Sequence, residues 1–222
     1  MNPKILIIIP AYNAAKYLVE LIQRITPYAS IEDILIINDG SSDNTEEIIQ
    51  SMDCRKISFP ENRGKGAALK VGFTVALQNG YDAVITIDAD LQHIPERLNV
   101  FREQFTSADL IIGTRNIKTR RMPLERQLTN NLTSLIISIF GSMRIRDSQS
   151  GYRMIKTSVL RNLRLTADRY DTESEMLFQT GYLGHTAGEV AIPTVYEGSH
   201  SFINPFKDTT RFIRQIWRRL WY

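Results

Sequence analysis

Hydrophobic positions along the chain form short continuous runs that alternate with longer amphipathic segments. Strands buried on both faces are apolar throughout, and the runs of that kind cover residues 4–9, 33–37, 82–87 and 108–112. A further strand is expected near residues 55–58. Helical spacing between the strands predicts helices over residues 14–25, 44–52, 65–78 and 95–105. This alternation predicts an α/β fold, with a mostly parallel sheet flanked by helices.

Polar segments follow the predicted strands at their carboxyl ends, where sheets of this kind bind ligands. The first strand is followed by PAYN (10–13) and the second by NDGSSD (38–43), while GKG (64–66) opens the third helix. Asp39 stands directly at a strand end, where its carboxylate can accept hydrogen bonds from a ribose or a base. The segment 42–44 is interpreted as a turn that caps the next helix. Lys65 is a candidate phosphate ligand, with an exposed lysine at a helix start as the alternative.

Two carboxylates, Asp88 and Asp90, end the apolar run within TIDADLQH (86–93). In extended chain they would point the same way, about 6.5 Å apart. They would then repel each other by roughly 2 to 3 kcal/mol. One interpretation is structural, with Asp90 capping a helix and Asp88 solvated. The other is a Mg²⁺ or Mn²⁺ ion that takes both carboxylates and fills its shell with water and phosphate oxygens. The polar ends of the other strands favour the metal.

Two nucleotide-binding motifs are excluded. GKG lacks the spacing of a Walker A loop, and Leu69 stands where a dinucleotide fingerprint needs glycine or alanine. The single cysteine, Cys54, cannot form an internal disulfide. The N-terminal apolar run is too short for a signal peptide, and no segment reaches the roughly 20 apolar residues of a membrane-spanning helix. A cytoplasmic protein is therefore expected.

Five motifs in this order carry a resemblance to a known family: PAYN, NDGSSD, ENRGKGAAL, DADLQH and the GTR of residues 113–115. The sequence resembles the family 2 glycosyltransferases of the GT-A fold, most closely the dolichol- and polyprenyl-phosphate mannose and glucose synthases. The likeness spans residues 4–155. It implies an inverting enzyme that uses a nucleotide-sugar donor and transfers the sugar to a lipid phosphate.

The resemblance also implies roles for particular residues. Asp88, Asp90 and Gln92 would hold the metal ion on the pyrophosphate of the donor. Pro10, Ala11, Tyr12 and Asp39 would also contact the donor. So would Lys65 and the segment formed by Asp88, Ala89 and Asp90. Many relatives have glutamate after PxYN, where this chain has Ala14, so a ribose contact is lost or moved and the donor is left open.

The acceptor decides which further residues are needed. A lipid phosphate has a second pKa near 6, so it is largely dianionic at neutral pH and needs cationic partners but no general base. The candidate cations are Arg115, Arg126 and Arg153, with surface ion pairs as the alternative.

A sugar hydroxyl as acceptor would instead require a general base. The available carboxylates are Asp147, Glu173 and Glu175, although acids at 173 and 175 also suit the start of a helix. A family 2 enzyme that extends a glycan is therefore the first alternative function, and a non-catalytic nucleotide-sugar binder is the second.

The basic excess lies at the end of the chain. Residues 200–222 carry a net charge of +4 within a total of +3, which leaves −1 for residues 1–199. Residues 1–199 are predicted to form the catalytic domain, and 200–222 a basic amphipathic helix with two tryptophans. Such a helix suits an anionic membrane surface on the cytoplasmic side, with the domain core or a second copy of the chain as alternative partners. The apolar segment 132–140 is a second candidate membrane contact or a core helix. No nucleic-acid reader motif accompanies the charge.

Overall fold

The computed structural model describes residues 2–115, 133–139, 141, 143, 145–169 and 171–193. Its strands are β1 (Ile5–Ala11), β2 (Ile34–Asn38), β3 (Arg55–Ser58), β4 (Ala83–Thr86), β5 (Leu110–Arg115), β6 (Arg153–Lys156) and β7 (Ala187–Ile192). The helices are α1 (Ala15–Ile25), α2 (Thr45–Gln50), α3 (Lys65–Gln78), α4 (Leu98–Glu103), α6 (Thr157–Leu160) and α7 (Asp171–Tyr182), and residues 133–139 are also helical. The five predicted strands and the first three predicted helices are confirmed. The expected helix over 95–105 is divided into a 3-10 turn, Pro95–Arg97, and α4.

All seven strands belong to one sheet in the order β3-β2-β1-β4-β6-β5-β7. Neighbouring strands are parallel except at β6, which is antiparallel to both β4 and β5. The predicted α/β class with a mostly parallel sheet is therefore confirmed. The sequence did not predict β6 or β7.

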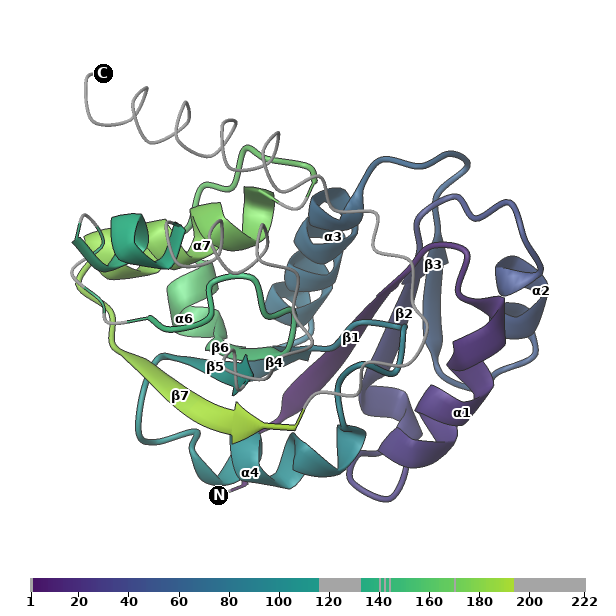
Figure 1. Cartoon of the computed structure of the whole chain (residues 1–222). Helices are drawn as coiled ribbons and strands as arrows, with labels where there is room; N and C mark the ends of the chain where they lie inside the picture. The colour runs from purple at the N-terminus through teal and green to yellow at the C-terminus, as the bar shows by residue number, and fades with distance from the viewer. Residues whose placement is uncertain are drawn as a thin grey trace.

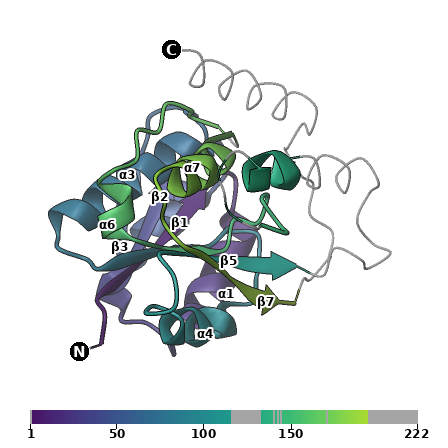
Figure 2. The ribbon, with the colours of Figure 1, turned by 90° about the vertical axis from the view of Figure 1, so that its left-hand side faces the viewer.

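Helices cover both faces of the sheet, as Figures 1 and 2 show. One face packs against α1 and α4 and the other against α3, α6 and α7. Alternate side chains of β1 divide between the two cores, with Ile7 in the first and Ile8 in the second, and both are fully buried. This burial on both faces explains why β1 reads as an uninterrupted apolar run.

The direction of the strands brings the candidate site residues to one edge of the sheet. β1, β2 and β4 are parallel, and β5 runs the same way because both β4 and β5 are antiparallel to β6. Their carboxyl ends therefore share one edge, which also holds the start of β6 at Arg153. We call this edge the catalytic rim.

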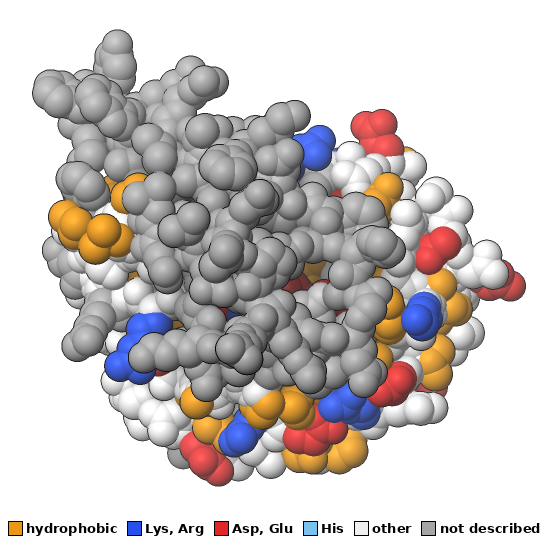
Figure 3. Space-filling view, in the orientation of Figure 1, with side chains coloured by type: hydrophobic (Ala, Val, Ile, Leu, Met, Phe, Trp, Pro, Cys, Tyr) orange, Lys and Arg blue, Asp and Glu red, His pale blue; other side chains and the backbone are white. Residues whose placement is uncertain are grey.

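The described part of the chain contains no helix long and apolar enough to cross a membrane. The predicted C-terminal helix and Arg126 lie outside the described residues. Within the predicted apolar segment 132–140, Ile137 is buried, while Leu135 and Ile139 are 57% and 63% exposed. Figure 3 shows acidic and basic side chains interspersed over the described surface of the face in view.

Candidate active site

Side-chain hydrogen bonds join the loops that follow β1 and β2. Asn13, which has a positive φ of 50°, accepts a hydrogen bond from the Ser42 N–H at 2.8 Å, and its own N–H donates to Ser41 Oγ at 2.9 Å. Asp43 accepts the N–H of Thr45, the first residue of α2, at 3.0 Å. The predicted turn is present, and Asp43 binds the first N–H of α2, whereas the N-cap residue Asn44 makes no side-chain capping bond. The turn also fixes the PAYN loop against the NDGSSD loop.

Asp39 is buried at the catalytic rim, where it anchors the segment that leads into α3. Its two carboxylate oxygens accept the N–H groups of Arg63 and Gly64, at 2.7 and 2.9 Å. Burial raises the pKa of Asp39, and these two hydrogen bonds only partly oppose the effect. The neighbouring Gly40 has a φ of 64°, and a Cβ there would lie 2.6 Å from the Glu61 Cα. This close approach of two loops requires a glycine.

The three predicted nucleoside contacts of the PAYN motif differ in exposure. Tyr12 is 39% exposed, Ala11 is buried at the end of β1, and Pro10 is half-buried. Tyr12 is therefore the accessible side chain of the three.

The DADLQH segment forms a turn, so the predicted extended geometry is wrong there. The β4 ladder ends at Thr86, Ala89 and Asp90 lie in a turn, and Leu91 has a positive φ of 58°. Asp90 Oδ1 accepts the N–H of Gln92 at 3.0 Å. Asp90 therefore stabilises the turn itself and does not cap a helix.

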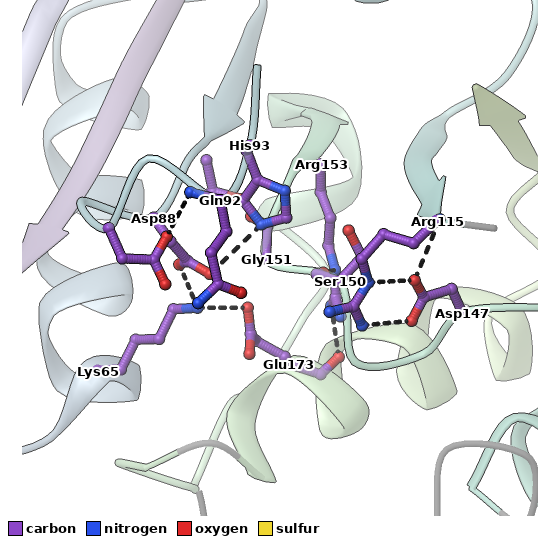
Figure 4. A network of polar contacts seen from close by, with 12 residues as sticks. Lys65, Asp88, Gln92, His93, Arg115, Asp147, Ser150, Gly151, Arg153 and Glu173 are labelled. Carbon is purple, nitrogen blue, oxygen red and sulfur yellow. Dashed lines mark hydrogen bonds and ion pairs between the residues drawn. The ribbon is translucent and has the colours of Figure 1, made fainter. Parts of the chain in front are cut away.

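Lys65 connects two acidic side chains that are far apart in the sequence (Figure 4). Its Nζ lies 2.5 Å from Asp88 Oδ1 and 3.0 Å from Glu173 Oε1. Lys65 begins α3 as predicted, but its side chain is only 14% exposed, so the alternative of a solvated lysine is wrong. Glu173 lies in the first turn of α7, as its predicted place at a helix start requires.

The charges of this cluster change one another's pKa. Burial acts to lower the pKa of Lys65, but Asp88 and Glu173 outweigh burial and raise it. Burial acts to raise the pKa of Asp88, yet Lys65 and His93 hold it well below its usual range. The pKa of Asp90 is raised, first by burial and then by the negative charge of Asp88. Asp88 is thus held in its charged form by Lys65 and His93, while the charged form of Asp90 is less well compensated.

His93 and Gly151 shape the surroundings of Asp88. His93 is buried, its Nε2 lies 3.5 Å from Asp88 Oδ2, and its ring packs against Tyr152 with the centroids 5.5 Å apart. A Cβ on Gly151 would lie 2.7 Å from Asp88 Cγ and closer still to Oδ2. The Gly151 carbonyl accepts a hydrogen bond from Thr86 Oγ1 at 2.7 Å. No role was predicted for either residue, although His93 belongs to the DADLQH motif and Gly151 stands two positions before the candidate Arg153.

Arg153 is fully buried and binds backbone carbonyls, so we treat it as a positioning residue. Its Nε, Nη1 and Nη2 donate to the carbonyls of Ser150, Glu173 and Ser148, at 2.6, 2.8 and 2.7 Å. The guanidinium thereby joins the 148–150 loop to the start of α7, as Figure 4 shows. It was predicted as a partner of the acceptor phosphate, but each of its three guanidinium nitrogens donates to a protein carbonyl.

Arg115 and Asp147 form a bidentate ion pair. Arg115 Nε lies 2.7 Å from Asp147 Oδ2, and Nη2 lies 2.9 Å from Oδ1. Asp147 is fully buried. Burial acts to raise its pKa, but the hydrogen bonds and charge of Arg115 outweigh burial and lower it. Arg115 is thus held at the end of β5 in a fixed orientation.

Glu175 is buried and holds the loop that precedes α7. Its carboxylate accepts hydrogen bonds from the Thr166 N–H and Oγ1, both at 2.9 Å, from the Ala167 N–H at 3.0 Å and from Gln179 Nε2 at 3.1 Å. With four donors around it, this carboxylate has a structural place and is poorly suited to act as a base.

The residues around Asp88 and Asp90 fit a hard divalent cation that is shared with a substrate. Such an ion takes one or two protein carboxylates and completes its shell with water and phosphate oxygens. The pKa of Asp90 is raised because its charged form is destabilised, and a bound cation would stabilise that form. Among the residues that the structure describes, no three acidic, histidine or cysteine side chains gather closely enough to hold an ion alone.

Comparison with known proteins gives a family for this arrangement. The model of the family described as glycosyl transferase family 2 matches residues 6–164. A UDP-N-acetylglucosamine–dolichyl-phosphate N-acetylglucosaminyltransferase of Methanococcus voltae is 32% identical, over 86% of this chain and 86% of that protein. An undecaprenyl-phosphate mannosyltransferase of Micrococcus luteus is 31% identical, over 86% of this chain and 84% of that protein.

Solved structures share the same fold. Glucosyl-3-phosphoglycerate synthase from Mycobacterium tuberculosis, in complex with uridine diphosphate, matches with a TM-score of 0.77 at 18% identity, over 98% of this chain and 80% of that one. The same enzyme with Mn²⁺, uridine diphosphate and phosphoglyceric acid matches with a TM-score of 0.76. The predicted GT-A fold is confirmed by this likeness, which at such identity bears on the fold alone.

Proposed function

Because the chain belongs to glycosyl transferase family 2 and is a glycosyltransferase, we propose that it transfers a sugar from a GDP- or UDP-sugar to a polyprenyl or dolichyl phosphate. The transfer is metal-dependent and inverts the anomeric carbon. The observation that carries the proposal is the carboxylate pair of Asp88 and Asp90 at the catalytic rim, with Lys65 directly against it. The names of the two relatives, which both act on lipid phosphates, support the choice of acceptor.

The donor is proposed to lie along the carboxyl ends of β1, β2 and β4. Tyr12 and Asp39 flank the nucleoside, and the diphosphate lies toward Asp90 and Lys65. Asp88, Asp90 and Gln92 would hold a Mg²⁺ or Mn²⁺ ion, which would supply Lewis-acid stabilisation of the charge on the departing diphosphate. Lys65 adds a fixed positive charge on the same side.

The transfer itself is a single displacement. An oxygen of the acceptor phosphate attacks the anomeric carbon of the sugar, and a new carbon–oxygen bond forms as the bond to the donor diphosphate breaks. The electron pair of the broken bond leaves with the nucleoside diphosphate. A dianionic phosphate carries no proton on the attacking oxygen, so no protein group has to remove one.

The condition of the candidate bases supports a phosphate acceptor over a sugar hydroxyl. A hydroxyl acceptor needs a carboxylate that is able to take a proton. Asp147 is bound on both oxygens by Arg115, Glu175 accepts four hydrogen bonds, and Glu173 is paired with Lys65. Arg115, held in place by Asp147, is the described cation that we propose for the acceptor phosphate, and Arg126 remains a further candidate.

A lipid acceptor requires that the enzyme meet a membrane. We propose peripheral binding on the cytoplasmic face, through the basic segment 200–222 and the apolar segment 132–140. The exposure of Leu135 and Ile139 supports a contact by the second of these segments.

A transfer assay read by mass spectrometry tests the proposal. It combines a panel of GDP- and UDP-sugars with a polyprenyl phosphate and Mn²⁺ or Mg²⁺, with EDTA as the blank. The expected product is the lipid phosphate with one added sugar, lost with EDTA and in Asp90→Asn. Asp82→Asn is the matched control, because Asp82 is exposed and caps the opposite end of β4, where it accepts the Lys4 N–H at 2.8 Å. Metal-dependent donor hydrolysis without any lipid product would refute the lipid acceptor.

A further inference from the structure

Lys65 lies directly beside Asp88, one of the carboxylates proposed to bind the divalent cation. Its ammonium group lies 2.5 Å from Asp88 Oδ1 and 3.0 Å from Glu173 Oε1. Asp88 is also close in sequence to Asp90, which lies in the following turn. The side chain of Lys65 is 14% exposed and that of Glu173 is 7% exposed. Solvent therefore screens the charges of Lys65 and Glu173 weakly, and each acts strongly on an ion that binds next to Asp88.

A free metal ion would meet an electrostatic obstacle at this position. A divalent ion lies about 2 Å from a carboxylate oxygen that binds it. An ion on Asp88 Oδ1 would therefore come within about 4.6 Å of Lys65 Nζ, since that nitrogen is 2.5 Å from the same oxygen. The other oxygen, Oδ2, already faces His93 Nε2 at 3.5 Å. Binding of the ion alone thus places a double positive charge beside an existing single one.

A diphosphate changes this balance. Its negative charge would lie between the ion and the ammonium group, so that each cation has an anion as its nearest neighbour. Lys65 can then replace its contact with Asp88 by a contact with a phosphate oxygen and retain its contact with Glu173. Both partners of Lys65 are side chains, which can reorient, whereas a partner in the backbone could not.

We propose that Lys65 is an internal counter-ion that makes metal binding depend on the diphosphate. In this role it neutralises Asp88 and Glu173 beforehand, disfavours the free ion, and favours the ion and the nucleoside diphosphate together. The inference rests on the proposed metal-dependent function and adds to it that the metal ion and the nucleoside diphosphate bind cooperatively. By thermodynamic linkage, the diphosphate must raise the metal affinity by the same factor by which the metal raises the diphosphate affinity.

The test is a Mn²⁺ titration followed by the electron paramagnetic resonance signal of the free ion, with and without UDP or GDP. For the wild type, the nucleoside diphosphate should tighten Mn²⁺ binding at least about tenfold. Lys65→Met should bind Mn²⁺ alone at least about tenfold more tightly than the wild type and lose most of the cooperativity. Lys65→Arg, which keeps the charge, should retain the cooperative behaviour.

Lys70→Met is the control for a lost lysine on the same helix. Lys70 pairs with the exposed Asp168, away from Asp88, so its loss should leave both titrations unchanged. A Lys65→Met protein that melts like the wild type but binds free Mn²⁺ no more tightly would overturn the proposal. So would a wild type whose Mn²⁺ affinity ignores the diphosphate, a result that needs no variant. A wild type that binds no Mn²⁺ even with UDP and GDP would instead refute the proposed metal dependence.

Discussion

Replacing Gly151 by alanine adds one methyl group directly against Asp88. The Cβ of the new residue would lie 2.7 Å from Asp88 Cγ and 2.7 Å from Oδ1, and closer still to Oδ2. The backbone of Gly151 does not adopt the left-handed region, so alanine is compatible with the local chain. The substitution therefore acts through the carboxylate and not through backbone strain.

The required movement can be worked from these distances. An ordinary contact begins at 3.4 Å, so Asp88 Cγ has to move by at least 0.7 Å, and Oδ2 further. Asp88 cannot yield freely, because Lys65 holds one of its oxygens at 2.5 Å and His93 lies 3.5 Å from the other. Misplacement of a positioned group by about 1 Å can cost roughly 100-fold in rate. We expect Gly151→Ala to lose about that factor in kcat/KM and to bind Mn²⁺ with nucleoside diphosphate more weakly.

The assay compares initial rates of sugar transfer to a polyprenyl phosphate at saturating Mn²⁺, with thermal melting recorded for each protein. Gly188→Ala is the matched control, because a Cβ on Gly188 in β7 would lie 3.3 Å from the Ala108 Cβ, so that only a small adjustment of that methyl group is needed. Its activity should stay within a few-fold of the wild type. If Gly151→Ala also transferred sugar at a rate within a few-fold of the wild type, Asp88 would not need its observed position, and the reasoning would fail.

Three further substitutions separate structural from chemical roles. Arg153→Met removes the buried guanidinium that donates to the carbonyls of Ser148, Ser150 and Glu173, so urea unfolding should show a loss of about 3 kcal/mol or more, and Arg153→Lys should recover only part of it. Glu175→Gln should cost about 1 to 3 kcal/mol in the same assay, because its new NH₂ faces donors, while the turnover per folded molecule stays unchanged; a selective loss of turnover would restore Glu175 as a base. The pKa of Asp147 is lowered in the folded state, so its stabilising effect is present above the unfolded pKa of about 3.9 and is lost as the pH falls below it. Stability measured from pH 5 down to pH 3 should therefore fall less steeply in Asp147→Asn than in the wild type, and equal slopes would contradict the pairing with Arg115.

The part of the fold that the sequence predicts is the part that is buried from both sides. β1, β2, β4 and β5 carry apolar side chains toward both helical layers, so their runs are recognisable without any partner. β6 has only four residues and begins with a charged Arg153, and its antiparallel position between β4 and β5 depends on chain segments far away. No local pattern contains that pairing, which is why β6 was not predicted.

The candidate site was predictable as a set of motifs but not as a set of contacts. Asp88 and Lys65 were both selected from their own motifs, and Glu173 was selected as an acid near a helix start. Their meeting depends on the packing of α7 on α3, where the Ala67 N–H donates to the Asp168 carbonyl at 3.1 Å and Gly66 leaves room for Thr172. Contacts of this kind, between residues about 100 positions apart, cannot be read from spacing.

Charged residues at the catalytic rim differ in whether their partners can be exchanged. Arg153 binds carbonyls of the main chain, which remain in place whatever ligand arrives, so its charge stays committed to the scaffold. Lys65 binds the side chains of Asp88 and Glu173, and a phosphate oxygen can replace either one without opening the backbone. Asp90 accepts the Gln92 N–H and has its pKa raised by burial and by Asp88, so a cation would stabilise its charged form. The groups best placed to respond to a metal and a diphosphate are therefore Lys65, Asp88 and Asp90. Arg153, one of the arginines predicted to bind the acceptor phosphate, instead holds the 148–150 loop against the start of α7.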